Sequence, residues 1–231
     1  MLAKKTVVLG ITGGIAAYKA ADLTRKLTLA GATVQVIMTE AATKLMALVT
    51  MRNISRRPVV TDMFDPASEY SVPHITLAEA ADVVVIAPAT ANTVAKLAAG
   101  IADNMLCAVV LATEAPVVVA LAMNDIMYRN PVTQQNIARL KARGFSIVSP
   151  EYGRLASGKM GWGRLTEVDN IVKAVEQALA KKSDLTGKSI VVTAGGTRSP
   201  LTRCATSATD PRGAWATPWR RRRGTGGQRS S

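Results

Sequence analysis

The most constraining feature of this 231-residue sequence is the stretch 73–104, in which a β-branched run leads directly into a turn and a helix. Val83 to Ile86 is a continuous apolar run, typical of a parallel strand that is buried on both faces. Small and polar residues follow at 87–92, and a helical pattern follows at 93–99. This order predicts a parallel α/β unit, which binds ligands at the carboxyl ends of its strands.

Strand and helix patterns alternate in the same way along most of the chain. The other predicted elements are strands at 6–11, 33–38, 116–122 and 145–148, and helices at 15–29, 40–48, 105–112, 131–143 and 168–181. Right-handed connections between such elements favour a doubly wound parallel sheet in three layers, of the Rossmann or flavodoxin-like type. Residues 153–165 are glycine-rich and lack apolar periodicity, so we expect a mobile loop there.

Polar or glycine residues follow the predicted strands at the expected ligand edge. Thr12, Gly13 and Gly14 separate the first strand from its helix, where glycines let the backbone approach an anion and the helix start supplies N–H groups. The pattern is not GxGxxG, which favours a mononucleotide over a dinucleotide. Thr39 follows the second strand. The helix at 93–99 can be capped by a residue of the turn 87–92, either Thr90 or Asn92.

Each of these residues also has a purely structural explanation. A Gly-Gly pair can simply reverse the chain, and Thr39 can be an ordinary helix cap. His74 is the only histidine, and a lone histidine is often a surface or capping residue. Asn124 follows the strand 116–122 and would by default form a turn. The residues alone therefore support a mononucleotide-sized site at the strand tips, with His74 near it in sequence.

Two stretches, PHITLAEAADVVVIAPATANTVAKLAAGIADN and GITGGIAAYKAADL, closely resemble the flavin-containing cysteine decarboxylases. The likeness is to the branch that acts on 4'-phosphopantothenoylcysteine and forms the N-terminal half of bifunctional coenzyme A biosynthesis proteins. It implies FMN as cofactor and His74 as the catalytic base, since an imidazole exchanges protons near neutral pH. The FMN contacts that it implies are Thr12, Gly13, Gly14, Ile15, Thr39, Pro88, Thr90, Ala91, Asn92 and Met123.

Two further motifs resemble this family and also depart from it. The run around Asn124 is similar to the family's Pro-x-Met-Asn-x-x-Met, whose Asn binds the substrate carboxylate, but Leu121 stands in the place of the proline. LASG resembles the family's flap Leu-Ala-Cys-Gly with Ser157 in the place of the cysteine. The resemblance assigns catalysis to Asn124 and Ser157, and substrate binding to Asn124, Met127, Lys159 and Arg164. Because a hydroxyl is less acidic than a thiol and has no redox chemistry, slow or incomplete turnover is predicted.

The resemblance also implies an assembly, a homotrimer or a multiple of trimers. Two other activities stay open: decarboxylation of a C-terminal cysteine in a peptide, which stops at the enethiol, and non-catalytic FMN binding in a regulatory protein. The first needs no flap cysteine. The second should bind FMN and release no carbon dioxide.

The charge of +13 first suggests a nucleic-acid partner, but much of it is concentrated at one end. Seven arginines and one aspartate lie after residue 198, which leaves 22 basic and 15 acidic residues for the rest of the chain. That balance favours anionic small substrates, and no nucleic-acid partner is expected. Cys107 and Cys204 lack metal-ligand spacing, so no metal is predicted. Without a predicted signal peptide or membrane span, we expect a cytoplasmic protein.

Three segments are predicted from these patterns. Residues 1–181 form the decarboxylase domain, and 182–198 comprise a linker and a first strand that resembles the opening of the synthetase half. Residues 199–231 have few aliphatic residues and predict disorder. Restoring one lost base in the codons near Arg198 changes this tail into an amino-acid sequence that resembles the opening of the synthetase half. We therefore interpret the tail as a frameshift product and expect no ligase activity. Resequencing tests that interpretation.

Overall fold

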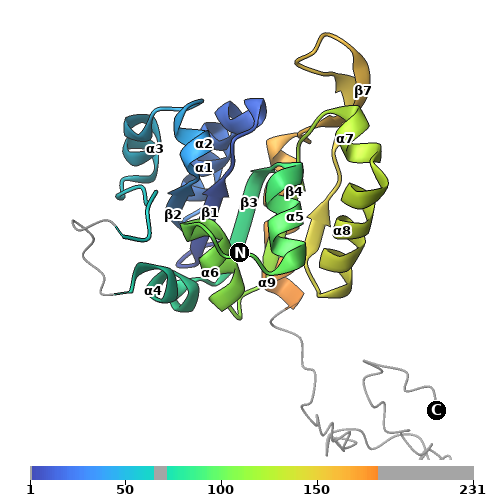
Figure 1. The fold of residues 1–231 in the computed structure, drawn as a ribbon. Coiled ribbons are helices and arrows are strands. Elements are labelled where there is room, and N and C mark those ends of the chain that lie inside the picture. Colours follow the sequence, from blue (N-terminus) through green and yellow to red (C-terminus); the bar gives the residue numbers. More distant parts are fainter. Residues whose placement is uncertain (1, 65–71, 182–231) are drawn as a thin grey trace, which may run out of the picture. The chain divides into compact units, whose positions relative to one another are not determined.

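A computed structural model describes residues 2–64 and 72–181 of the chain (Figure 1). The chain divides into two units after Ser183, and the described residues lie in the first unit. The predicted linker at 182–198 and tail at 199–231 lie outside the described residues, so both stay predictions. No helix within the described ranges is long and apolar enough to cross a membrane.

Five parallel strands form the central sheet in the order β2-β1-β3-β4-β5. These strands are β1 Thr6–Ile11, β2 Thr33–Met38, β3 Val83–Ala89, β4 Val117–Leu121 and β5 Ser146–Val148. In register, Val7 of β1 lies opposite Val34 of β2 and Val83 of β3. All residues of β3 and β4 are buried, because helices cover both faces of the sheet. The predicted doubly wound sheet is confirmed, and its strand order is that of a flavodoxin-like fold.

Helices and strands enclose two hydrophobic clusters, one on each face of the sheet. Alternate strand residues face opposite sides, so Val83 and Val85 join one cluster and Val84 and Ile86 join the other. The first face is covered by α1 Lys19–Leu29, α3 Leu48–Ser55 and α9 Val168–Lys181. The second face is covered by α4 Pro73–Ala80, α5 Ala91–Ala99, α6 Met105–Ala112 and α8 Pro131–Ala142.

The position of β1 creates a switch point in the sheet. The chain leaves β1 toward β2 on one side and later returns to β3 on the other side. In sheets of this kind the connections diverge at that place, and a crevice opens at the carboxyl ends of the two strands. The turns after β1 and β3, which the sequence singles out, therefore flank the switch point.

The structure differs from the expected elements at two places near the first helices. The predicted helix 15–29 starts as a short 3₁₀ helix, η1 Ile15–Tyr18, and continues as α1. The predicted helix 40–48 is instead the single turn α2 Glu40–Thr43, followed after a break by α3. The break lets Met46 and Met51 pack on the first cluster, a tertiary contact that helical periodicity alone does not reveal.

The expected mobile loop at 153–165 is wrong, because much of this stretch lies in an antiparallel hairpin. The hairpin consists of β6 Glu151–Arg154 and β7 Met160–Arg164. Its inward positions are occupied by Gly153, Gly161 and Gly163, and its outward positions by exposed residues such as Trp162. Apolar alternation is therefore missing from the sequence although the burial of the chain alternates.

Candidate functional site

The side chain of Thr12 joins the turns that follow β1 and β3. Its hydroxyl donates a hydrogen bond to the carbonyl of Pro88 (2.7 Å) and accepts one from the backbone N–H of Thr90 (3.2 Å). Thr12 is buried, so water does not compete for these bonds. The structure thus brings the segments 12–15 and 88–92 together at the switch point. We call these two segments the cradle.

Gly13 allows the first of these turns to approach its neighbour closely, and Gly14 beside it has more space. A Cβ atom on Gly13 would lie 2.4 Å from the Cβ of Ala41, which follows the start of α2. A Cβ atom on Gly14 would lie 3.4 Å from the Cγ2 of Thr90 and 3.7 Å from the Cγ of Pro88. Gly13 is therefore required by the packing, whereas Gly14 faces the second turn across ordinary contact distances.

Three helix starts converge at the cradle. Gly14 is the N-cap of η1, Thr39 caps α2 by accepting from the N–H of Ala42 (3.3 Å), and Thr90 caps α5 by accepting from the N–H of Thr93 (3.4 Å). Of the two cap candidates for α5, Thr90 is the one that caps it, and Asn92 is exposed in the first turn. The first N–H groups of a helix lack partners within it and carry a partial positive charge. The arrangement suits a phosphate group.

Asn124 follows β4 at the same edge of the sheet. The N–H of Ala122 donates to the carbonyl of Ala89 (3.0 Å), which holds the end of β4 beside the end of β3. The side-chain oxygen of Asn124 caps α7 Asp125–Arg129 by accepting from the N–H of Ile126 (3.0 Å). This cap orients the side chain, and its exposed amide NH₂ group keeps two donors that suit a carboxylate. The preceding residue, Met123, is half-buried, and Met127 is exposed on α7.

Asp125 ties the hairpin to the segment that carries Asn124. Its Oδ1 accepts hydrogen bonds from the N–H of Trp162 (2.8 Å) and from the Nε of Arg129 (2.9 Å), and the N–H of Met123 donates to the carbonyl of Gly163 (3.0 Å). Gly163 has φ +134°, and a Cβ there would lie 1.9 Å from the carbonyl oxygen of Met123. Asp125 is not among the residues that the sequence predicts. The spacing of Asp125 and Arg129, an i,i+4 pair beside the motif, is the signal that could have found it.

The hairpin extends past the end of the sheet beside α7 (Figure 1). At its tip the N–H of Gly158 donates to the carbonyl of Leu155 and the N–H of Leu155 donates to the carbonyl of Lys159, both at 2.8 Å. Ser157 and Lys159 are exposed at this tip. Their side chains are therefore presented to solvent.

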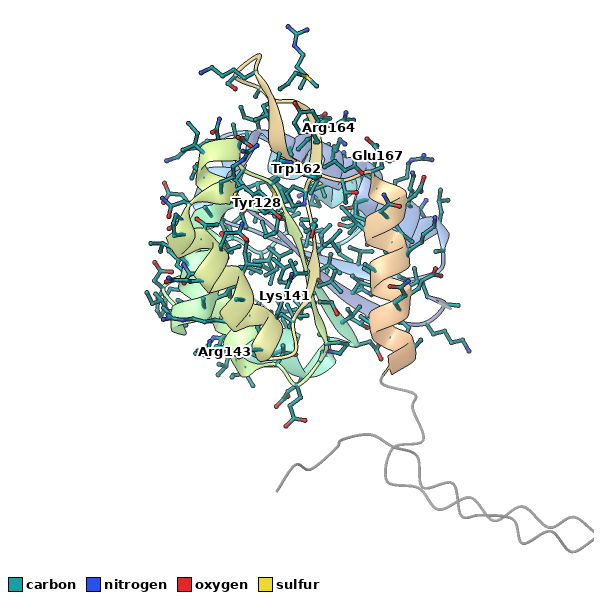
Figure 2. The ribbon with its side chains drawn as sticks, turned by 90° about the vertical axis from the view of Figure 1, so that its right-hand side faces the viewer. Tyr128, Lys141, Arg143, Trp162, Arg164 and Glu167 are labelled. Atoms are coloured by element: carbon teal, nitrogen blue, oxygen red, sulfur yellow. The ribbon has the colours of Figure 1, made fainter. Side chains whose placement is uncertain are left out.

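The base of the hairpin is tied to the start of α9. Arg164 forms an ion pair with Glu167 (2.6 Å), and Figure 2 shows these two residues near Trp162. Glu151 accepts from the hydroxyl of Thr166 (2.5 Å) and from the N–H of Glu167 (3.2 Å). The bond from Thr166 lowers the pKa of the Glu151 carboxyl below its ordinary value. Arg164 thus has an internal partner besides its predicted role toward substrate.

His74 is not brought to the cradle within one chain. It is the second residue of α4, which packs on α6 and is held there by a hydrogen bond from the hydroxyl of Thr113 to the carbonyl of Ala78 (2.9 Å). Asp82, just after α4, accepts from the N–H of Thr6 at the amino end of β1 (2.9 Å). Figure 1 shows α4 at the opposite end of the sheet from α7.

Comparison with known proteins gives a consistent set of relatives. Residues 1–180 match the protein family described as Flavoprotein. The coenzyme A biosynthesis bifunctional protein CoaBC of Vibrio vulnificus (strain YJ016) is 50% identical over 200 residues, which are 87% of this chain and 50% of that protein. The CoaBC protein of Bacillus subtilis (strain 168) is 46% identical over 203 residues, with the same two shares. The chain thus spans about half the length of the curated relatives that it matches.

Solved structures extend this comparison to the fold. The FMN-dependent cysteine decarboxylase SpaF has a TM-score of 0.69 at 32% identity, covering 80% of this chain and 100% of its own. A cysteine-to-serine mutant of a PPC decarboxylase, complexed with pantothenoylaminoethenethiol, has a TM-score of 0.68 at 32% identity, with shares of 75% and 97%. The FMN-binding protein AtHal3 has a TM-score of 0.68 at 31% identity, with shares of 78% and 100%.

Proposed function

Since the chain belongs to the flavoprotein family, we propose that it binds FMN at the cradle and decarboxylates 4'-phosphopantothenoylcysteine to 4'-phosphopantetheine. The observation that carries this proposal is the hydrogen-bonded junction of segments 12–15 and 88–92, made by Thr12 at the switch point. Relatives with the name of a coenzyme A biosynthesis protein, at 50% identity over 200 residues, support the choice of substrate.

The residues around the cradle fit a flavin mononucleotide. The close turn at Gly13 and Gly14 and the helix starts at Ile15, Thr39 and Ala91 offer backbone N–H groups for the phosphate. We assign the remaining FMN contacts to Pro88, Thr90, Asn92 and Met123. When bound, FMN supplies the two-electron oxidation of the cysteinyl side chain that allows its carboxylate to leave as carbon dioxide.

Asn124 holds the substrate carboxylate in this proposal. Its capping bond to the N–H of Ile126 fixes the side chain, so the amide donors are positioned before substrate arrives. The hairpin lies beside this segment. Met127, Lys159 and Arg164 are the substrate contacts that the family motif predicts. Asp125 keeps the hairpin attached to the Asn124 segment.

His74 acts as the base in this proposal, but from a neighbouring subunit. Within one chain α4 and the cradle lie at different ends of the sheet, so an assembly has to bring them together (Figure 1). Large apolar side chains are exposed beside the cradle, at Ile15 and Tyr18, and on α7 and the hairpin, at Ile126 and Trp162. Exposed apolar groups of this kind favour contact between subunits. We therefore propose a homotrimer, or a multiple of it, located in the cytoplasm with its phosphorylated substrate.

Ser157 supports a second candidate function. Without a flap thiol, the reaction can end at an enethiol, which is the product expected of a peptidyl-cysteine decarboxylase. The solved neighbour that holds pantothenoylaminoethenethiol is itself a cysteine-to-serine mutant, so a serine in such a protein is compatible with a bound enethiol. The non-catalytic FMN-binding alternative is less well supported, because this chain has both His74 and Asn124.

A direct assay separates these functions. The purified full-length chain, loaded with FMN, is incubated with 4'-phosphopantothenoylcysteine or with a peptide that ends in cysteine, and carbon dioxide and product masses are followed. Release of carbon dioxide from the first substrate alone supports the proposal. Release from the peptide alone favours the second candidate, and bound FMN with no release from either substrate favours the regulatory one.

A further inference from the structure

Three exposed arginines border a shallow, open depression of the surface at the carboxyl end of α3. The depression has a volume of about 370 Å³ and is lined by Arg52, Asn53, Arg56, Arg57 and Pro58. The chain that follows it runs along the outer edge of the sheet, where Val60 bridges to Ile37 of β2. None of the cradle residues lines this depression, which we call the arginine pocket.

The charge of the arginine pocket is not neutralised by the part of the chain that the structure describes. Arg52, Arg56 and Arg57 form no ion pair with a described carboxylate, whereas Arg25, Arg129 and Arg164 each form one. Arg52 lies in the last turn of α3, where the helix dipole stabilises a positive charge. Arg56 and Arg57 are exposed and have no such partner among the described residues.

Buried polar side chains fix the wall of the pocket. Gln35 of β2, which is buried, donates to the carbonyl of Pro58 (2.8 Å). The hydroxyl of Ser55, also buried, accepts from the N–H of Arg57 (3.3 Å). Between them Arg56 adopts a left-handed conformation, with φ 57° and ψ 29°, which favours glycine. An arginine therefore occupies a position where glycine would be less strained, and its side chain lines the pocket.

From these observations we propose that the arginine pocket binds a small ligand that carries two or more phosphate groups. Guanidinium groups bind phosphate oxygens through two parallel hydrogen bonds, and three of them match more than one phosphate. The site is separate from the cradle and does not depend on the proposed decarboxylase activity.

The test is a calorimetric titration of the FMN-saturated, full-length chain with pyrophosphate, inorganic phosphate and a short single-stranded oligonucleotide. FMN occupies the cradle, so that phosphate binding there does not contribute to the signal. The variants are Arg56→Gly and the double change Arg52→Gln with Arg57→Gln. The matched control is Arg139→Gln with Lys141→Gln on α8, which removes the same charge from exposed residues elsewhere.

We expect one pyrophosphate to bind per chain in the unaltered protein and in the control, more tightly than inorganic phosphate. Both pocket variants should weaken this binding by at least roughly tenfold, while their melting temperatures without ligand stay level or rise. Equal pyrophosphate affinity in all four proteins would overturn the proposal, as would no binding at millimolar concentration. Loss of oligonucleotide binding alone, without any pyrophosphate binding, would also overturn it and point to a nucleic-acid surface.

Discussion

At the scale of single residues, the candidate site depends on side chains that have one role in the fold and leave other atoms free for a ligand. Thr12 uses its hydroxyl to hold two turns together and takes up the N–H of Thr90, while the first N–H groups of η1 and α5 remain for an anion. Asn124 uses its side-chain oxygen as a helix cap and leaves its amide donors exposed. In both cases the structural explanation and the functional one are compatible.

Ser157 stands at the position where the family motif has a cysteine. Changing Ser157→Cys should raise the yield of fully converted product by at least roughly tenfold, because a positioned proton donor contributes about 10²–10⁴-fold to a rate. Ser157 is exposed at the hairpin tip, so the fold should tolerate the change. Product masses after equal reaction times measure the effect, and Ser149→Cys, also exposed, is the control for an added thiol. Equal yields from Ser157→Cys and the unaltered protein would show that the residue at position 157 does not limit turnover.

At the scale of elements, the hairpin and α7 form one coupled unit around Asp125. The change Asp125→Ala removes the acceptor for the N–H of Trp162 and should loosen the hairpin, whereas Asp125→Asn keeps an oxygen there and should rescue part of the effect. Trypsin cleavage after Lys159 should become faster in the alanine variant, and kcat/KM should fall by roughly tenfold. Asp103→Ala, which removes a surface ion pair with Lys96, serves as control. Unchanged cleavage and kinetics would show that Asp125 does not position the hairpin.

The hairpin base should also respond to pH through Glu151. Its carboxyl has a lowered pKa in the folded chain, chiefly because the hydroxyl of Thr166 donates to it. A lowered folded pKa stabilises the protein above the unfolded value of about 4.3, and this contribution is lost as pH falls through the folded pKa. Glu151→Gln should therefore have a smaller loss of unfolding free energy between about pH 5 and 3 than the unaltered protein. Identical pH profiles from denaturant titrations would contradict this assignment.

The parallel strands and their helices were predictable because a short β-branched apolar run is typical of a parallel strand that is buried on both faces. The run Val83–Ile86 identifies β3, and 105–112 was predicted with the bounds that α6 has. The hairpin was not predictable, since its inward positions are glycines that carry no apolar signal. The need for glycine at positions 161 and 163 appears only in the folded chain, where Asp125 packs against Gly161 and Met123 against Gly163.

The site was predictable only in part for a similar reason. Residues that follow strands, such as Thr12 and Asn124, meet at one edge of any parallel sheet. His74 lies on a helix that packs at the opposite end of the sheet (Figure 1). In the proposed assembly its relation to the cradle depends on neighbouring subunits, which sequence patterns do not specify.

At the scale of the whole molecule, the proposed shared site can be tested by mixing subunits. His74→Gln and Asn124→Ala should each abolish activity. When the two variants are unfolded together and refolded at equal amounts, about a quarter of the sites should combine an intact His74 with an intact Asn124 from its neighbour. Activity should then return to about a quarter of that of the unaltered protein, with each variant refolded alone as control. No recovery in mixed trimers of verified composition would mean that both residues must come from one chain.

The central claim is that a flavin mononucleotide occupies the cradle, and the flavin affinity of Gly14→Val tests it most directly. Gly14 has an extended backbone with φ −115°, and space for a Cβ remains beside Thr90, so the fold should accept valine while its side chain fills the phosphate position. Fluorescence titration should show one FMN per chain in the unaltered protein and in Ala138→Val on α8. In Gly14→Val the affinity should fall by more than roughly a hundredfold at an unchanged melting temperature of the flavin-free protein. Full FMN affinity in Gly14→Val, or no FMN binding by the unaltered chain, would contradict the account.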